Sequence, residues 1–271
     1  MPELPEVETT RRYLSPFVEG AVVERLIVRV AKLRWPVPAR LAEQMAGRRI
    51  LALQRRGKYL LFRLDAGTLI VHLGMTGVMC WLADPPVPGR HDHLDMLFRG
   101  GGCLRFSDPR RFGSILWTEG NPLSHPLLAP LGPEPLGEKF DGAYLFRVSR
   151  GRSLAVKQLI MDSHLMVGVG NIYACESLFL ARIHPARPSE SLSEDECEQL
   201  ARSVRRVLED ALAAGGTAIG GLMGIEEKPG YFPISLKVYA REGEPCGVCG
   251  AALLRTRQGG RSTYFCDQCQ L

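Results

Sequence analysis

The chain has 271 residues, 45% of them hydrophobic, which is enough for a sizeable core and, by length, for two domains. No apolar run reaches the roughly 18 residues of a membrane-spanning helix, and the acidic N-terminus lacks the apolar segment of a signal peptide. The formal net charge is +5, but Arg25 to Arg63 hold eleven basic residues and one acid, while Glu190 to Glu198 hold five acids and no base. The first region could bind a polyanion, and a solvated basic face is the alternative.

The N-terminus, MPELPEVE, places Pro2 next to Glu3. Removal of Met1 would leave Pro2 as a secondary amine beside a carboxylate. Because an α-amino group has a reference pKa of about 7.7–8.0, much of it is neutral and nucleophilic near neutral pH. Attack of such an amine on a sugar carbon gives an iminium ion, an electron sink for breaking nearby bonds. The alternative is an ordinary helix start with Pro5 near its first position and acids in its first turn.

The N-terminal half predicts one helix followed by short strands. The helix runs over Leu4–Leu14 and is expected to stop at Pro16. The strand-like runs are rich in Val, Ile, Leu and aromatic residues, and their spacing predicts an antiparallel sandwich or barrel. They are Ala21–Val30, Arg49–Arg55, Tyr59–Leu64, Thr68–Leu73, Gly77–Leu82, His93–Phe98, Cys103–Phe106 and Gly113–Trp117.

The C-terminal half has a different character. Five prolines and three glycines between Gly120 and Gly137 indicate a linker. Helical periodicity follows over Phe140–Ser149, Ser153–Met161, Asn171–Ala181 and Ser193–Ala213. Ser193 and Glu196 form a capping box for the last helix, which a double glycine ends.

Two CxxC pairs form the strongest local motif of the chain. Sixteen residues separate Cys249 from Cys266, within the set Cys246, Cys249, Cys266 and Cys269. This spacing predicts a tetrahedral zinc site of four thiolates on two hairpin knuckles, which leaves no open position for catalysis. The site could simply hold the C-terminus together, but its hairpin also carries Arg255, Arg257 and Arg261, well placed to touch phosphates. The other four cysteines are scattered and predict reduced thiols.

Three further motifs carry candidate binding groups. Gly168-Val-Gly170-Asn171 joins two predicted helices by a turn that could bind a phosphate, although an ordinary helix hairpin is the simpler interpretation. Lys58 follows Gly57 at a strand start, where a lysine could be a general acid, a phosphate ligand or neither. Met75, Arg110 and Phe112 lie on predicted turns, where bulky side chains can fill the gap left when a base leaves a duplex.

Together these motifs resemble the bacterial formamidopyrimidine-DNA glycosylase family, which includes endonuclease VIII. The resemblance spans nearly the whole chain, from Pro2-Glu3 through Gly57-Lys58, His72-Leu-Gly-Met75 and His91-Asp-His93. It continues through Asp108-Pro-Arg-Arg-Phe-Gly113, Gly168-Val-Gly-Asn-Ile-Tyr173, Lys228-Pro-Gly-Tyr231 and the cysteine motif.

The resemblance implies a multidomain α and β fold. Residues 1–119 would form a catalytic antiparallel β-sandwich with a flanking helix, followed by a linker over 120–139. Residues 140–234 would form a helix–two-turn–helix domain whose loop 215–234, with Thr217 and Tyr231, closes over the lesion. Residues 235–271 would form the zinc finger, and duplex DNA would lie between the sandwich and the helical domain.

The resemblance also implies the chemistry. Pro2 would attack C1′ of the damaged nucleotide and Glu3 would protonate the opening sugar, with β- and δ-elimination assisted by Lys58 and Arg261. Met75, Arg110 and Phe112 would fill the void. The further DNA contacts would be His72, His91, Arg152 and Asn171. The partner would be damaged double-stranded DNA, bound by a monomeric cytoplasmic enzyme that has no membrane partner and associates with the nucleoid through DNA. Beyond one structural zinc ion, the amine chemistry needs no cofactor.

Two alternatives stay open at this point. The endonuclease VIII branch prefers oxidised pyrimidines, although Leu4-Pro5-Glu6-Val7 and the trio Met75, Arg110 and Phe112 favour the purine branch. A non-catalytic zinc-ribbon DNA-binding module would need no free Pro2 amine.

One segment departs from the family pattern. Relatives usually follow the double glycine with two Ser or Thr residues and Leu-Arg-Asp-Phe, whereas this chain has Thr217-Ala-Ile-Gly-Gly-Leu-Met223. Two added glycines raise the entropy lost when the loop orders, and side-chain donors are fewer. We therefore expect weaker capping of 8-oxoguanine, unless backbone amides alone serve.

A loop graft tests this expectation. Ala218→Thr, Ile219→Leu, Gly220→Arg and Gly221→Asp together should raise 8-oxoguanine excision relative to formamidopyrimidine excision, with cleavage at preformed abasic sites unchanged. Single-turnover rates on the three substrates measure the ratio. An unchanged ratio would show that this loop sequence does not tune specificity.

Overall fold

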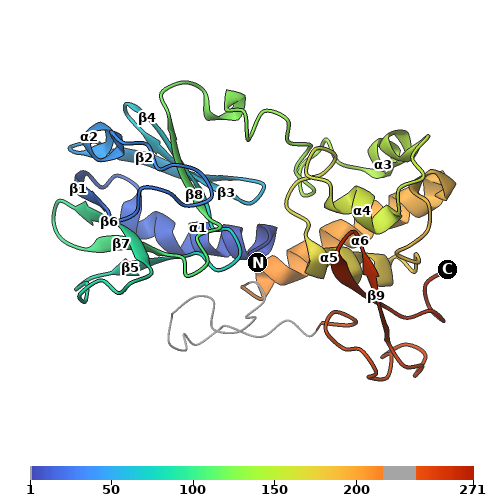
Figure 1. Ribbon diagram of the computed structural model, residues 1–271. Coiled ribbons are helices and arrows are strands. Elements are labelled where there is room, and N and C mark those ends of the chain that lie inside the picture. Colours follow the sequence, from blue (N-terminus) through green and yellow to red (C-terminus); the bar gives the residue numbers. More distant parts are fainter. Residues whose placement is uncertain (1, 216–235) are drawn as a thin grey trace. The chain divides into compact units, whose positions relative to one another are not determined.

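The computed structural model describes residues 2–215 and 236–271 (Figure 1). Its contacts divide these residues into two compact units, residues 2–129 and residues 130–214 with 236–271. The division falls inside the predicted linker. The predicted lesion-capping residues Thr217 and Tyr231 lie outside the described residues.

The first unit is an antiparallel sandwich of two four-stranded sheets (Figure 1). One sheet has the order β1-β6-β7-β5 and the other β2-β3-β4-β8. The strands are β1 Val23–Val28, β2 Ile50–Arg56, β3 Tyr59–Leu64, β4 Gly67–His72, β5 Val78–Leu82, β6 Asp92–Phe98, β7 Cys103–Ser107 and β8 Ser114–Thr118. All eight predicted strands are therefore present, and their ends lie within two residues of those predicted.

The core of this unit lies between the sheets and under one helix. Leu60, Phe62, Leu69 and Leu104 are among its fully buried members. Fully burying an aliphatic or aromatic side chain stabilises the fold by about 1.5–3 kcal/mol. This packing, repeated over both sheets, fixes the strands whose connecting loops carry the candidate site residues.

Helix α1, Leu4–Val18, is longer than predicted because Pro16 lies inside it rather than ending it. The proline removes one amide donor, but Leu14 and Val18 are fully buried and anchor the last turn. The amide of Glu19 also donates to the carbonyl of Ser15 at 3.0 Å. The short helix α2, Leu41–Met45, is too brief to show a period in the sequence.

The second unit is helical and ends in a hairpin. Its helices are α3 Gly142–Ser149, α4 Val156–Met161, α5 Asn171–Leu180 and α6 Glu194–Ala213. The predicted capping box is present at α6, with the Glu196 amide 3.2 Å from the Ser193 hydroxyl. Strands β9 Leu254–Gln258 and β10 Arg261–Phe265 form the hairpin, and a short 3-10 turn occupies Ser189–Ser191. A second 3-10 turn, Pro122–Ser124, belongs to the first unit. Within the described ranges, no helix is long and apolar enough to cross a membrane.

Candidate functional site

Pro2 and Glu3 lie at the start of α1, where Glu3 is the N-cap residue. Both are buried, and Glu3 is 2% exposed. The carboxylate of Glu6 accepts a hydrogen bond from the Glu3 amide at 2.8 Å, which completes a capping box. The segment therefore forms a helix start, as the alternative interpretation of the sequence predicted. It also holds Pro2 and the neighbouring carboxylate of Glu3 in one defined place.

Lys58 lies on the two-residue turn that joins β2 to β3, since Arg56 pairs with Tyr59 in the ladder. Gly57 has a φ of +56°, whereas Lys58 does not adopt a positive φ. This is the pattern of a type II′ hairpin turn, which favours glycine at its first central position. The turn presents Lys58 at the end of the sheet.

His72 ends β4 beside this turn, and its ring lies 4.8 Å from that of Tyr59. Burial lowers the pKa of His72 to about 4, and the positive charges of Lys58 and Arg34 add to the effect. The imidazole is therefore neutral at pH 7. Its Nδ1 accepts a hydrogen bond from the Gly74 amide at 2.9 Å, so the ring proton resides on Nε2, which can donate to a phosphate oxygen.

Met75, Arg110 and Phe112 are brought together on two adjoining loops. Met75 is 37% exposed and Phe112 45%, so neither belongs to the core. The Arg110 guanidinium lies 4.7 Å from the centre of the Phe112 ring in a cation–π contact. The loops touch at Gly74, where an added Cβ would lie 2.4 Å from the backbone of Phe112, so only glycine fits.

Asp108, which the motif contains but to which no role was predicted, organises these loops. It is fully buried, and its carboxylate accepts hydrogen bonds from the Thr76 hydroxyl at 2.6 Å and the Gly113 amide at 2.7 Å. The Arg110 amide also lies 3.3 Å from the same carboxylate. One side chain therefore fixes both the Met75 loop and the Arg110–Phe112 loop. Between them, Arg111 is held at a φ of +55°, which is strained for a residue other than glycine.

The histidines before this loop have different environments. His93 is buried, and its Nε2 lies 2.8 Å from the Asp108 carbonyl oxygen. His91 is partly exposed, with its Nε2 accepting from the Arg90 guanidinium at 2.9 Å, and its carbonyl accepts from the Asp108 amide. His91, predicted to contact DNA, is therefore the accessible member of the pair.

Asn171 begins α5, directly after Gly170. Its side-chain amide donates to the Ser262 carbonyl at 2.9 Å, so it contacts the hairpin of the C-terminal motif. Its side-chain oxygen accepts from the ammonium of Lys157 at 2.7 Å. The side chain predicted to contact DNA thus also joins the helices to the hairpin.

Lys157 is the centre of this junction, and no sequence motif pointed to it. It is 1% exposed and lies in the apolar helix α4. Besides Asn171, its ammonium donates to the Thr263 hydroxyl at 2.7 Å and the Ser262 carbonyl at 3.1 Å. Three acceptors satisfy the three donors of an ammonium, which is the condition for burying one.

Arg261 is exposed at the first position of β10, next to this junction. The hairpin turn before it consists of Gly259 and Gly260, with φ values of +53° and +77°. Two positive φ angles define a type I′ turn, the hairpin turn that glycine allows. Arg255, by contrast, is paired with Glu242 at 3.0 Å. Arg152 is exposed after α3, and its guanidinium donates to the Val148 carbonyl at 2.8 Å.

The four clustered cysteines form a zinc site. Their sulfur atoms all lie within 4.8 Å of one another. The Cys246 and Cys269 sulfurs are 3.8 Å apart, and those of Cys249 and Cys266 are 3.5 Å apart. Zinc–sulfur bonds of about 2.3 Å in a tetrahedron require sulfur separations of about 3.8 Å, so this arrangement fits one structural Zn2+. Cys246 and Cys266 also pack against Cys175 and Phe179 of α5, which places the zinc site on the helical unit.

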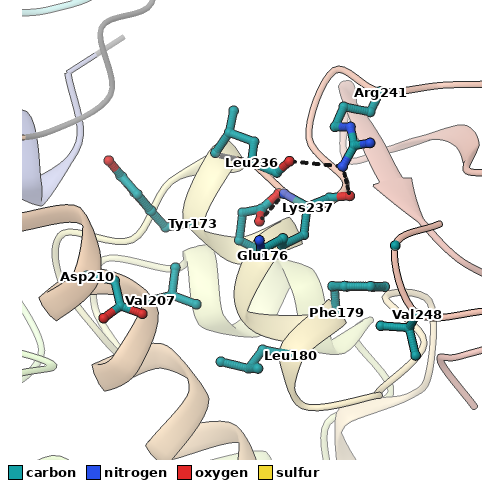
Figure 2. A pocket seen from close by; sticks show the side chains of 11 residues that line it. Tyr173, Glu176, Phe179, Leu180, Val207, Asp210, Leu236, Lys237, Arg241 and Val248 are labelled. Carbon is teal, nitrogen blue, oxygen red and sulfur yellow. Dashed lines mark hydrogen bonds between the residues drawn. The ribbon is translucent and has the colours of Figure 1, made fainter. Parts of the chain in front are cut away.

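Glu176 fixes the chain segment that enters the zinc finger (Figure 2). It is 6% exposed, and its carboxylate accepts from three successive amides, those of Lys237, Val238 and Tyr239, at 2.8–2.9 Å. Arg241 binds the carbonyls of Leu236 and Lys237 from the other side. Glu176, Lys237 and Arg241 border a largely apolar pocket of about 400 Å³ between α5, α6 and the finger.

Three family models match the chain in order. They are the formamidopyrimidine-DNA glycosylase N-terminal domain over residues 1–115, the H2TH domain of that glycosylase over 131–221, and the zinc finger found in FPG and IleRS over 243–271. A formamidopyrimidine-DNA glycosylase from Geotalea uraniireducens (strain Rf4) is 56% identical over 270 residues and matches all of both chains. The chain belongs to the formamidopyrimidine-DNA glycosylase family.

Further relatives extend the match. The formamidopyrimidine-DNA glycosylase of Geobacter sulfurreducens is 52% identical over the full length of both chains. The crystal structure of the MutM (Fpg) protein from Thermus thermophilus matches with a TM-score of 0.85 and 41% identity, covering 99% of this chain and 98% of that one. Lactococcus lactis Fpg in complex with DNA containing N7-benzyl-Fapy-dG matches with a TM-score of 0.91 and 33% identity, covering 99% of each.

The chain is therefore a DNA repair glycosylase of oxidised purines with lyase activity at abasic sites, and damaged DNA is its partner. The purine branch of the family is confirmed over the endonuclease VIII branch, and an enzyme over a non-catalytic zinc ribbon. The zinc finger, the helical domain and the β-sandwich expected from the resemblance are likewise confirmed.

Asp108→Asn should impair the glycosylase at the lesion more than at an abasic site. The amide cannot accept from the Thr76 hydroxyl and both loop amides, so the Met75 and Arg110–Phe112 loops should lose their fixed geometry. We expect 8-oxoguanine excision to fall about tenfold, because a misplacement of about 1 Å can cost up to a hundredfold. Single-turnover assays on duplexes with 8-oxoguanine and with a preformed abasic site measure the difference. Thr76→Val, which removes one contact, should have a smaller effect, and equal losses on both substrates would contradict the loop role.

Cys249→Ser should release zinc and weaken DNA binding, because structural zinc supplies folding free energy to a small domain. The affected contacts are those of β10 with Lys157 and Asn171, next to Arg261. Zinc content by mass spectrometry under native conditions and affinity for an abasic-site duplex are the measurements. Cys80→Ser, outside the cluster, is the control. Unchanged DNA affinity in zinc-free protein would show that DNA binding does not depend on the zinc-bound finger.

Proposed function

We propose that Pro2, Glu3, Lys58 and Arg261 carry the chemistry of this glycosylase. The observation that carries the proposal is the position of Pro2 and Glu3 at the positive end of α1. A helix N-terminus stabilises a nearby carboxylate and disfavours a further positive charge, so an uncharged proline amine is favoured there after Met1 is removed.

The reaction starts when the Pro2 nitrogen attacks C1′ of the damaged nucleotide. The bond from C1′ to the base breaks, the base leaves with the bonding electrons and takes a proton, and the nitrogen loses its own proton. Glu3 takes up the proton that the Pro2 nitrogen loses and delivers it to the ring oxygen as the sugar opens, which leaves an iminium ion between Pro2 and C1′. A general acid held in this way contributes about 10²–10⁴-fold to the rate.

Two eliminations then remove the sugar. The iminium ion acidifies the C2′ hydrogen, and its loss expels the 3′ phosphate in β-elimination, assisted by Lys58. A second proton loss expels the 5′ phosphate in δ-elimination, assisted by Arg261. The product is a one-nucleotide gap with phosphate at both ends. Hydrolysis of the iminium ion then regenerates the Pro2 amine.

DNA contacts come from both units of the protein in this proposal. Met75, Arg110 and Phe112 replace the everted base in the stack, which offsets part of the cost of a few kcal/mol for extruding it. His72 donates through Nε2 to a phosphate, and His91, Arg152 and Asn171 add further contacts. Because phosphate contacts dominate, affinity should fall steeply with salt.

We propose that the protein acts as a monomer, because one duplex lesion engages a single set of catalytic and void-filling residues. Its DNA substrate places it in the bacterial cytoplasm, at the nucleoid. The domain limits proposed are 1–119, the linker 120–139, 140–234 and 235–271, close to the ranges of the matched family domains.

Borohydride trapping on a duplex with 8-oxoguanine opposite cytosine tests the nucleophile. The mature chain should form a covalent adduct, while a variant that retains Met1 should form none. Pro2→Gly should keep a primary amine and some trapping. Glu3→Gln should bind the duplex but lose at least about a hundredfold in base release. A covalent adduct with the Met1-bearing chain would show that Pro2 is not the nucleophile.

A further inference from the structure

The carboxylate of Glu8, on the second turn of α1, joins this helix to β2, the strand that leads into the Gly57-Lys58 turn. Glu8 is nearly buried, with 12% of its side chain exposed. Arg11 and Arg12 of the same helix donate to it at 2.8 and 3.0 Å. Arg55 of β2, which is 13% exposed, donates to it through Nε at 3.1 Å.

The Arg55 contact differs in kind from the other two. Arg11 and Arg12 lie three and four residues from Glu8, where ion pairs on one helix surface are common and weak. Arg55 lies 47 residues away and is largely shielded from water, so its pairing with Glu8 is a long-range contact in a low dielectric.

Arg55 also contacts the turn that carries Lys58. While Nε of its guanidinium binds Glu8, Nη1 donates to the carbonyl of Gly57 at 2.9 Å. The Gly57 carbonyl belongs to the central peptide of the type II′ turn. Rotation of that peptide is the motion that interconverts type I′ and type II′ turns, and it would redirect the following residue. A planar guanidinium held at both edges opposes this rotation.

We propose that Glu8 is a positioning residue for Lys58, acting through Arg55 and the Gly57 carbonyl. Because α1 also carries Pro2 and Glu3 at its start, the same link sets the catalytic lysine relative to the proline nucleophile within one unit. The inference rests on the proposed roles of Pro2 and Lys58.

The charge state of Glu8 supports this role. Burial would raise the pKa of its carboxyl, but the hydrogen bonds and charges of Arg11, Arg12 and Arg55 outweigh burial and lower the pKa below its usual value. Glu8 is therefore ionised under the conditions at which the enzyme acts, and it can hold the Arg55 guanidinium in the orientation that also reaches Gly57.

Glu8→Gln is the principal test, made in the full-length protein. On a duplex with a preformed abasic site, the single-turnover rate of β-elimination should fall about tenfold, because loss of orientation alone commonly costs this much. Borohydride trapping of the Schiff base on the same duplex, which requires Pro2 but not Lys58, should change less than about twofold. A purely structural defect would reduce both.

The chain offers a matched control in Glu19. Its carboxylate also joins α1 to β2, by accepting from the Leu53 amide at 2.8 Å, but it does not contact Arg55 or Gly57. Glu19→Gln should therefore leave the ratio of β-elimination to trapping unchanged. Arg55→Gln should reproduce the Glu8→Gln ratio, and the double variant should be no worse than the more impaired single variant, because both act on one link.

A Lys58→Ala background decides whether the effect passes through Lys58. There, Glu8→Gln should cause no further loss of β-elimination. A further tenfold loss, or a Glu8→Gln variant with the wild-type ratio, would overturn the positioning role. If Glu8→Gln fails to fold, judged by its melting temperature, Arg55→Lys takes its place, since a single ammonium cannot span the Glu8 carboxylate and the Gly57 carbonyl. Wild-type protein that neither traps nor cleaves the duplex would instead refute the proposed function.

Discussion

The packing of the two four-stranded sheets against each other determines where the loops that carry the proposed catalytic and void-filling residues of the first unit lie. Leu60 and Phe62 of β3 and Leu69 of β4 are fully buried between the sheets, so the ends of these strands cannot shift without opening the core. The Lys58 turn precedes one of them, and His72 ends the other. An antiparallel sandwich thus supplies fixed strand ends, and the short turns between them carry the proposed site residues.

Buried charged side chains hold together segments that the apolar core does not fix. Asp108 joins two loops, Lys157 joins two helices to the zinc hairpin, and Glu176 holds the segment before the finger. Each charge is costly to bury and is matched by several hydrogen bonds of defined direction. Apolar contacts would hold the same segments together, but they would tolerate sliding. Directional hydrogen bonds select one arrangement, as a preorganised binding site requires.

Local patterns in the sequence predicted the elements, whereas contacts between distant residues decided the rest. Strand alternation, the capping box at Ser193 and the CxxC spacing each depend on a few neighbouring residues, and each is confirmed. Pro16 was expected to end a helix because local chemistry disfavours it, but burial of Val18 outweighed that preference. Lys157 and Glu176 were detectable as single charges within apolar helices. Their partners on the zinc finger and its entry segment were not, because those lie 61 to 106 residues away in the chain.

The Lys157 junction has a consequence for the order in which the protein matures. Its partner on β10 lies 106 residues later in the sequence. At a synthesis rate of about 5–20 residues per second, the ribosome completes α4 several seconds before that partner emerges. The ammonium of Lys157 therefore lacks its acceptors on Ser262 and Thr263 until almost the whole chain has been made, so the helical unit can reach its final packing only after synthesis is nearly complete.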